Sequence, residues 1–188
     1  MIDLKKVLAR AGIVEGSVVL DFGCGEGTYT IPTAYLAGRS GKVYALDMDT
    51  EALDRLRLKI RLLGLGNIVI IETSGELAIP LSSKTLDYVL LFDVLHSWYF
   101  PESDRRLRLL GEVHRVLKPE GRLIFYPGDP EVFNKREELE AILREISASR
   151  FKAEETLTEN LIHEGTLVKG HIYRFKKTFK SYRHSFRD

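Results

Sequence analysis

Short apolar runs alternate with helical patterns along most of the chain. Residues 18–20 and 43–46 are apolar, and they are followed by helical patterns over 28–38 and 51–63. Such runs are typical of buried strands, and apolar residues on one face are typical of a helix that packs on a sheet. Gly64 follows the second helical segment and predicts its end. The chain is therefore expected to begin its fold as strand, helix, strand, helix.

The same alternation continues through the middle of the chain and changes near its end. Further strands are predicted over 68–71, 86–92 and 123–126, and further helices over 3–11, 104–117 and 135–147. Two last strands, 151–160 and 167–175, have only a short turn between them at Glu164 and Gly165, which predicts a hairpin at the edge of the sheet. Strands that are apolar along their length and alternate with helices favour a parallel sheet covered on both faces. The predicted fold class is α/β.

Composition narrows the class of protein. The chain has 188 residues, with 28 lysines and arginines against 27 aspartates and glutamates, and one cysteine. We expect a single domain, 1–188, divided into an N-terminal helix (1–15), a core (16–130), a last helix with the terminal hairpin (131–176) and a basic tail (177–188). One cysteine excludes an intramolecular disulfide and a cysteine-rich zinc site. No segment approaches the roughly 18 apolar residues of a membrane span, and no signal peptide is evident, so a cytoplasmic protein is expected.

A glycine-rich turn follows the first predicted strand. Gly23, Gly25 and Gly27 stand at alternate positions, and Asp47 ends the second strand twenty residues after the last of them. Glycines permit a tight turn and leave no side chain in front of a ligand. In open parallel sheets, ligands bind beyond the carboxyl ends of strands near this point, where an acid accepts hydrogen bonds from the ribose hydroxyls. The arrangement predicts a nucleoside-binding site.

The spacing within this turn argues against a dinucleotide. The dinucleotide fingerprint holds a pyrophosphate at a helix N-terminus and requires a third glycine at position 28, where this chain has Thr28. Asp21 precedes the turn, and its carboxylate suits a cationic amino group better than a diphosphate. An NAD-dependent oxidoreductase is the enzymatic alternative, distinguished by which cofactor binds.

Three segments of the chain carry sequence motifs in a definite order. Residues 21–27 read Asp-Phe-Gly-Cys-Gly-Glu-Gly, residues 86–96 span the fourth strand and its end, and residues 112–123 lead into the fifth strand. In this order they resemble the motifs of class I S-adenosylmethionine-dependent methyltransferases. Within that family, the chain is similar to the small methyltransferases of the ubiquinone and menaquinone biosynthesis group. The resemblance implies a Rossmann-like, doubly wound sheet of seven strands, mostly parallel with an antiparallel C-terminal hairpin strand. It also implies S-adenosylmethionine as the cofactor.

The resemblance assigns roles around the methionine part of the cofactor. Gly23, Gly25 and Gly27 correspond to the loop that packs against it, and Cys24 is a small residue within that loop. Asp21 corresponds to a position near the amino group. These five residues are therefore expected to bind the cofactor.

The resemblance also assigns roles around the nucleoside. Asp47 corresponds to the acid on the ribose hydroxyls, and Met48 to the apolar residue against adenine, with a core methionine as the alternative for Met48. Many relatives carry an acid after the third strand that accepts a bond from the adenine amino group. Here Thr73 or Ser74 stands in its place, and the N–H of Gly75 is available to the ring.

Candidate catalytic residues follow the fourth and fifth strands. Asp93 begins the motif that faces the methyl donor in the family, and the resemblance implies that it contacts the cofactor. His96 and Asp129 are the candidate catalytic residues and are expected to point toward the mouth of the site. A general base is needed only if the acceptor loses a proton; His96 is the first candidate, and a pocket-wall histidine is the alternative. Three aromatic residues either line the acceptor site or pack its rim: Trp98, Tyr99 and Tyr126. No cluster has metal-ligand spacing, so no metal is predicted.

The predicted function is transfer of a methyl group from S-adenosylmethionine to a small-molecule acceptor, because no separate recognition domain is evident. Residues 174–187 interleave basic and aromatic side chains, a pattern that suits nucleic acid or an anionic surface, with a solvated extension as the simpler alternative. A catalytically silent cofactor-binding subunit and an RNA or protein methyltransferase are the alternative functions. The acceptor and the oligomeric state stay open.

Overall fold

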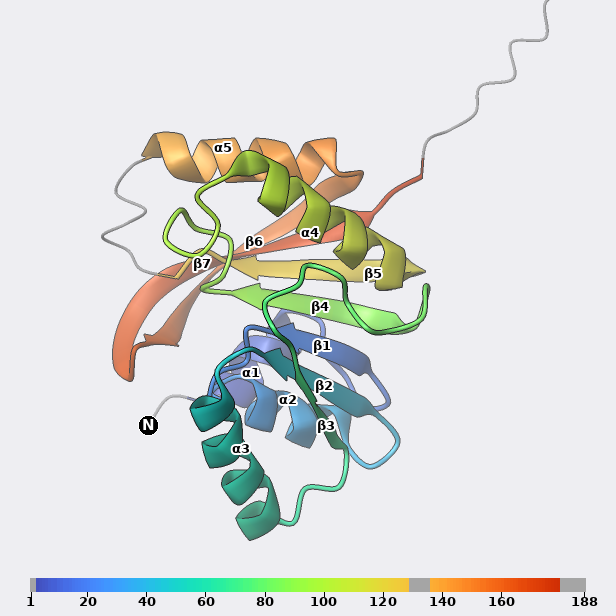
Figure 1. Cartoon of the computed structure of the whole chain (residues 1–188), viewed down its shortest axis with the longest axis vertical. Helices are drawn as coiled ribbons and strands as arrows, with labels where there is room; N and C mark the ends of the chain where they lie inside the picture. The colour runs from blue at the N-terminus through green and yellow to red at the C-terminus, as the bar shows by residue number, and fades with distance from the viewer. Residues whose placement is uncertain (1–2, 129–135, 180–188) are drawn as a thin grey trace, which may run out of the picture.

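Seven strands form one mixed sheet in the computed structural model, which describes residues 3–128 and 136–179. The strands lie in the order β3-β2-β1-β4-β5-β7-β6 (Figure 1). Their bounds are β1 (Val18–Phe22), β2 (Lys42–Asp47), β3 (Ile68–Glu72), β4 (Leu86–Phe92), β5 (Leu117–Tyr126), β6 (Phe151–His163) and β7 (Thr166–Lys177). The strands from β3 to β5 pair in parallel, whereas β7 is antiparallel to both β5 and β6. The predicted fold class, including the edge hairpin, is confirmed.

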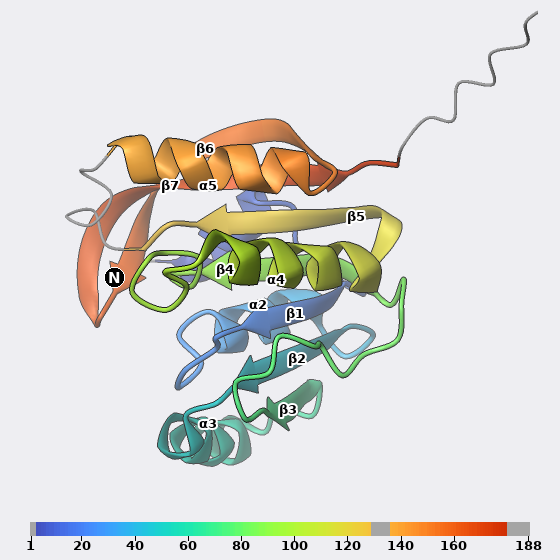
Figure 2. The same ribbon diagram turned by 45° about the horizontal axis from the view of Figure 1, so that its top comes forward.

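Helices cover both faces of this sheet. α1 (Leu4–Arg10), α2 (Thr30–Ala37) and α3 (Thr50–Leu63) pack on one face, and α4 (Ser103–Val116) and α5 (Arg136–Ala148) on the other (Figure 2). Successive strand residues point to opposite faces, so Val89 and Leu91 pack toward α4, whereas Leu90 and Phe92 pack toward α1. Burial on both faces explains why these strands are apolar along their length.

The helix ends follow local chemistry, with one exception. The Asp49 side chain accepts a hydrogen bond from the Ala52 N–H, 3.0 Å away, and begins α3, and Gly64 ends it in the left-handed conformation. In α4 the spacing of leucines predicts Leu107 on the buried face and Leu117 as the last residue. Both expectations are wrong.

The exception in α4 has a structural reason. Leu107 is 38% exposed, and the buried residues are Leu109, Leu110, Val113 and Val116. The first turns of α4 contact α5 through a buried ion pair, in which Arg106 Nε lies 2.6 Å from Glu145 Oε2, rather than through an apolar stripe. Leu117 begins β5, opposite Leu86 of β4.

The terminal hairpin is longer than its sequence pattern predicts. β6 continues three residues past Asn160, and the turn at Glu164 and Gly165 takes positive φ angles of 45° and 76°. The turn end of this hairpin curves past the carboxyl end of β4 (Figure 1). The Tyr29 hydroxyl fastens it there, because it accepts from the Ile162 N–H at 3.0 Å and donates to the Ile162 carbonyl at 2.9 Å.

The first basic residues of the predicted tail belong to β7. Arg174 pairs with Glu154 and Glu155, and Lys176 Nζ lies 2.7 Å from Glu120 Oε2. Lys177 is buried and donates to the Leu117 carbonyl. These cations are therefore used within the fold, and residues 180–187 of the tail lie outside the described residues. Over the ranges that are described, every helix is too short or too polar to cross a membrane.

We expect Tyr29→Phe to loosen the hairpin. The variant leaves the Ile162 N–H and carbonyl without their partner, which costs about 1–3 kcal/mol in the free energy of unfolding. Denaturant unfolding measures the loss, and hydrogen exchange at the Ile162 amide should accelerate. Tyr35→Phe, at a half-exposed ring of α2, is the control, and an equal loss in both variants would contradict the role of Tyr29.

Candidate active site

A cavity of about 420 Å³ opens at the carboxyl ends of the central strands. This volume lies in the range of small-molecule sites. The wall takes residues from the turn after β1, the ends of β2, β3 and β4, and the start of α4: Phe22, Gly23, Gly25, Leu46, Asp47, Met48, Asp49, Thr73, Gly75, Glu76, Leu77, Phe92, Asp93, Val94, Tyr99, Phe100 and Arg105. Its place, where the chain leaves β1 for one side of the sheet and β4 for the other, is where open α/β sheets bind ligands.

The three glycines after β1 have different surroundings. All three take positive φ angles, which glycine adopts without strain. Gly25 lines the cavity, and a Cβ there would meet open space. Gly23 also lines it, but its Cβ would lie 2.6 Å from Val94 Cγ2. A Cβ on Gly27 would overlap Leu56 of α3, so packing against that helix requires this glycine.

Two predicted cofactor residues lie behind the cavity wall. Cys24 is buried against Leu53 and Leu56 of α3, and burial raises the pKa of its thiol far above the ordinary value. Asp21 is 2% exposed, and its Oδ2 accepts a bond from the Thr30 hydroxyl at 2.6 Å. Burial, together with the charge of Asp47, raises the pKa of Asp21 to about 6 despite that bond. A buried carboxylate of this kind favours a cationic partner.

Backbone N–H groups hold the Asp47 carboxylate at the cavity wall. Its Oδ2 accepts from Gly25 N at 2.6 Å, and its Oδ1 accepts from Met48 N at 2.7 Å and Asp49 N at 3.0 Å. These three bonds orient the carboxylate and tie the glycine turn to the end of β2. One oxygen retains a free lone-pair direction for a ligand, since a carboxylate accepts about four hydrogen bonds.

The segment after β3 faces the end of β2 across the cavity. Met48 is 64% exposed, which excludes a core position, and its Cε would lie 3.5 Å from a Cβ placed on Gly75. Thr73 lines the cavity, whereas Ser74 is exposed and does not. Glu76 also lines the cavity. Sequence reasoning missed this acid, which stands a few residues after the position where relatives carry one.

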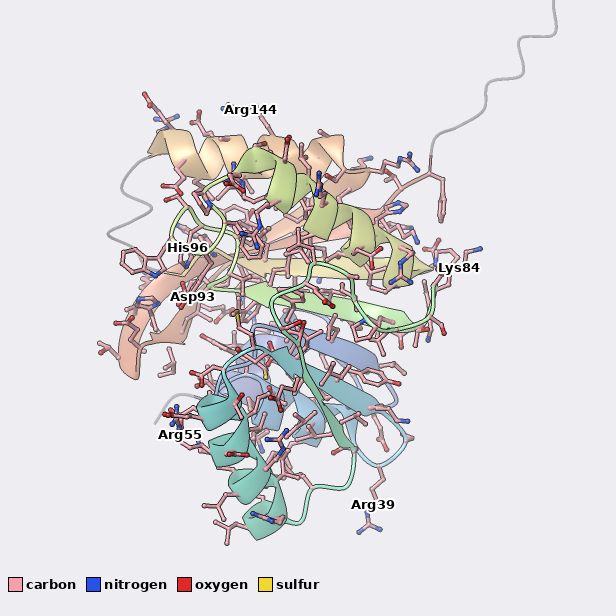
Figure 3. The ribbon with its side chains drawn as sticks, viewed as in Figure 1. Arg39, Arg55, Lys84, Asp93, His96 and Arg144 are labelled. Carbon is pink, nitrogen blue, oxygen red and sulfur yellow. The ribbon has the colours of Figure 1, made fainter. Side chains whose placement is uncertain are left out.

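Asp93 leaves β4 in the left-handed region of backbone conformation. Its φ is +59°, its N–H donates to the Tyr126 carbonyl, and a Cβ on Gly128 would overlap its carboxylate. Figure 3 places Asp93 and His96 together at the end of β4, beside the turn end of the hairpin. His96 is buried and does not line the cavity; its Nε2 lies 3.3 Å from Asp93 Oδ1.

A second histidine, which sequence reasoning missed, reaches the same carboxylate. His163 Nδ1 lies 2.9 Å from Asp93 Oδ2. His163 is the last residue of β6, and the predicted strand stops three residues short of it, so no local pattern indicated the contact. Asp129, the other predicted catalytic residue, lies outside the described residues.

The three candidate aromatic residues separate in the structure. Tyr99 lines the cavity and stacks at an angle on the His96 ring, with centroids 4.9 Å apart. Trp98 is 83% exposed beside it in the sequence, whereas Tyr126 is buried in the core against Phe92. Burial and the nearby carboxylate of Asp93 raise the pKa of Tyr99, and Glu164 of the hairpin turn contributes to the same shift.

The chemistry of the wall fits a cationic nucleoside. Four acids line the cavity, Asp47, Asp49, Glu76 and Asp93, against one base, Arg105, and Asp21 is buried behind the wall. Within residues 3–128 and 136–179, no group of three ligating side chains is arranged to hold a metal ion. The absence of a metal stays a prediction.

Comparisons with known proteins decide the family. Residues 20–125, more than half of the chain, match the methyltransferase domain family. The chain belongs to the class I S-adenosylmethionine-dependent methyltransferases. The predicted family and the predicted cofactor, S-adenosylmethionine, are confirmed, and the dinucleotide alternative is not supported.

Individual relatives of this methyltransferase agree. A demethylmenaquinone methyltransferase of Geobacillus stearothermophilus is 32% identical over 117 residues, which are 62% of this chain and 47% of the relative. The ubiquinone/menaquinone biosynthesis C-methyltransferase of Escherichia coli is 33% identical over 115 residues, 61% of this chain and 43% of the relative. The methyltransferase thus spans less than half the length of these curated relatives. The crystal structure of a SAM-dependent methyltransferase from Aquifex aeolicus has a TM-score of 0.72 and 28% identity, covering 92% of this chain and 89% of that one.

We expect Gly27→Ala to destabilise the methyltransferase more than Gly25→Ala. Both substitutions place a side chain at positive φ, which costs about 1–2 kcal/mol, but only the first drives a methyl group into Leu56. The overlap adds about 1–3 kcal/mol. Chemical denaturation of the two variants measures the difference, and equal losses would contradict the packing role of Gly27.

The methyltransferase without ligand should gain stability from Asp21→Asn. Because folding raises the pKa of Asp21 from 3.8 to about 6, its ionised form costs up to about 2–3 kcal/mol above pH ~6. The cost disappears as pH falls below the unfolded value of 3.8. Unfolding midpoints from pH 4 to pH 8 should therefore diverge as pH rises, with the variant higher. A constant difference would contradict the shift.

Proposed function

We propose that this methyltransferase transfers a methyl group from S-adenosylmethionine to a small-molecule acceptor that enters the cavity beside Asp93 and Tyr99. The observation that carries the proposal is the acid-lined cavity at the switch point of the sheet, formed by the segments that the family uses for its cofactor. When bound, S-adenosylmethionine supplies a methyl carbon on a positively charged sulfur. The cavity's excess of carboxylates complements that charge.

In this proposal, different residues bind the amino group and the rest of the methionine part of the cofactor. Asp21, behind the glycine turn, is the partner of the amino group, and Gly23 and Gly25 lie along the methionine part. Cys24 and Gly27 act indirectly, because they pack the turn onto α3. This division explains why a buried, raised-pKa carboxylate is kept at the end of β1.

The nucleoside is assigned to the other half of the cavity. Asp47 accepts from the ribose hydroxyls, and adenine lies between Met48 and Gly75. Thr73 and Glu76 are the acceptors proposed for the adenine amino group, in place of the predicted Ser74, because both line the cavity. The side chain of Met48 would then lose exposure when the cofactor binds.

Much of the rate of such a displacement comes from alignment of the acceptor with the methyl carbon and from exclusion of water. The chain provides for both at the β4 end of the cavity. Phe92, Val94 and Phe100 form an apolar wall, and the exposed Tyr99 stands at the opening. The buried His96 contacts the Asp93 carboxylate on the side away from the cavity. Asp129 stays a candidate catalytic residue from the sequence alone.

We propose an aromatic acceptor with hydroxyl groups as the first to test. The support is twofold: the apolar and aromatic wall just described, and the relatives named for demethylmenaquinone and for ubiquinone and menaquinone biosynthesis. The nucleic-acid alternative has less support, because Arg174 and Lys176 pair with acids of the sheet.

Two measurements test the proposal. Calorimetric titration should show micromolar binding of S-adenosylmethionine and S-adenosylhomocysteine and none of NAD. Release of S-adenosylhomocysteine should then follow on addition of 1,4-naphthohydroquinone. Binding of NAD alone would contradict the cofactor site, and tight cofactor binding without turnover on any hydroquinone would favour the silent subunit.

We expect Asp47→Ala to raise the dissociation constant for S-adenosylhomocysteine about 10- to 100-fold, the scale of about 1–3 kcal/mol for a lost charged hydrogen-bond partner. Asp54→Ala is the matched control, because Asp54 is an exposed acid of the neighbouring helix and pairs with Arg57 outside the cavity. Calorimetry measures both. An unchanged dissociation constant in Asp47→Ala would remove this residue from the ribose site.

A further inference from the structure

A carboxylate lies between two imidazoles at the β4 end of the cavity. Asp93 Oδ1 is 3.3 Å from His96 Nε2, and Asp93 Oδ2 is 2.9 Å from His163 Nδ1. Asp93 lines the cavity, and its side chain is 31% exposed, whereas the two histidine side chains are 9% and 16% exposed. The cluster of Asp93, His96 and His163 therefore presents its carboxylate to the cavity and its imidazoles to the protein.

Hydrogen bonding within this cluster is incomplete. Asp93 Oδ1, His96 Nδ1 and His163 Nδ1 are buried. Among the described residues none of the three has a well-aligned hydrogen bond, although Asp93 Oδ1 and His163 Nδ1 lie within ion-pair distance of His96 Nε2 and Asp93 Oδ2. A buried polar atom without a partner costs about 1–3 kcal/mol, and such atoms in native proteins call for an explanation. His96 Nδ1, which has neither kind of contact among the described residues, and the poorly aligned contacts of Asp93 leave hydrogen-bonding capacity that a ligand can use.

The backbone around the carboxylate is specialised in the same way. Asp93 is one of four non-glycine residues among those described with a positive φ, and such strain concentrates at functional sites. Gly128, after β5, lies so close to the carboxylate that a Cβ at this position would overlap it. His163 reaches the Asp93 carboxylate because β6 extends to the hairpin turn, where the Tyr29 hydroxyl bonds the neighbouring residue Ile162. Three separate segments thus converge on one side chain.

We propose that Asp93, His96 and His163 form a proton-accepting cluster, so that the acceptor of this methyltransferase attacks through an oxygen or nitrogen that carries a proton. The inference rests on the proposed function and adds the chemical class of the acceptor. The lone pair of the hydroxyl or amine forms the bond to the methyl carbon, and the electrons of the broken carbon–sulfur bond stay on sulfur. The acceptor's proton passes to the cluster and then to solvent.

The three residues of the cluster have different roles. Asp93 is the catalytic residue, because its carboxylate faces the cavity. His96 and His163 are positioning residues that hold the two carboxylate oxygens and share the proton. An imidazole is a stronger base than a carboxylate in water, so a shared proton makes the cluster a better acceptor than Asp93 alone, and general bases of this kind contribute about 10²- to 10⁴-fold in rate.

Nuclear magnetic resonance of the histidine rings tests whether the cluster shares a proton, without an acceptor. Asp93→Asn keeps the backbone, since asparagine tolerates positive φ, and removes the anion. In wild type, the rings of His96 and His163 should each show a downfield N–H proton signal from the nitrogen that faces Asp93, and both signals should move upfield in Asp93→Asn. The other ionisable groups around the cluster are constant in this comparison: Tyr29, Tyr99, Tyr126, Glu138 and Glu164. His171, exposed on β7, is the internal control, and N–H signals of His96 and His163 that do not move would overturn the shared proton.

Turnover tests the role in catalysis. With 1,4-naphthohydroquinone as the probe, His163→Gln should lower kcat about 100-fold and leave KM and the dissociation constant for S-adenosylhomocysteine near wild type. The loss should shrink as pH rises toward about 10, because the hydroquinone then loses its proton unaided. His171→Gln on the same hairpin is the control for folding. A loss independent of pH, or equal in the two variants, would reduce His163 to a structural residue.

A panel of probes tests the acceptor class. An O-methyl or N-methyl product, formed together with S-adenosylhomocysteine, is expected with the hydroquinone, catechol or 2-phenylethylamine. No product is expected with nicotinamide or dimethyl sulfide, whose nucleophilic atoms have no proton to lose. The reverse selectivity would overturn the proposal. Failure of wild type to bind S-adenosylmethionine at all would instead contradict the proposed function. The resonance measurement on the histidine rings needs no cofactor and would still test the cluster.

Discussion

Two carboxylates meet at the ends of neighbouring parallel strands, and much of the site depends on how their charges are accommodated. Asp47, at the end of β2, is stabilised by three backbone N–H groups, one of which comes from the glycine turn after β1. Asp21, one strand over, is buried and accepts a hydrogen bond from the Thr30 hydroxyl, and burial raises its pKa to about 6. The pair fixes the path of the turn and leaves an excess of negative charge beside the cavity. A cationic nucleoside relieves that excess, which links the fold of the loop to the family's cofactor.

Most elements were predictable because their signals are local. Apolar runs buried on both faces and glycines after helices specify β4 and α3 almost to the residue. The glycine turn and Asp47 were predictable for the same reason, since their spacing reflects one strand, one turn and the next strand. The seventh strand's antiparallel direction came from the family resemblance and the short turn at Glu164.

Other features depend on tertiary contacts and were not predictable. Leu109 replaces Leu107 in the core because the first turns of α4 meet α5 through Arg106 and Glu145. Gly27 resembles its neighbours in sequence, yet only its contact with Leu56 explains it. His163 lies seventy residues from Asp93 in the chain, and the contact exists because the hairpin bends past β4. The C-terminal hairpin thus supplies a residue, His163, that reaches the carboxylate at the end of β4.

A crystal structure with S-adenosylhomocysteine tests the central claim most directly. The amino group is expected near Asp21, the ribose hydroxyls on Asp47, adenine between Met48 and Gly75, and the sulfur turned toward Asp93. A nucleoside bound outside this cavity, or one inside it with its ribose away from Asp47, would contradict the account.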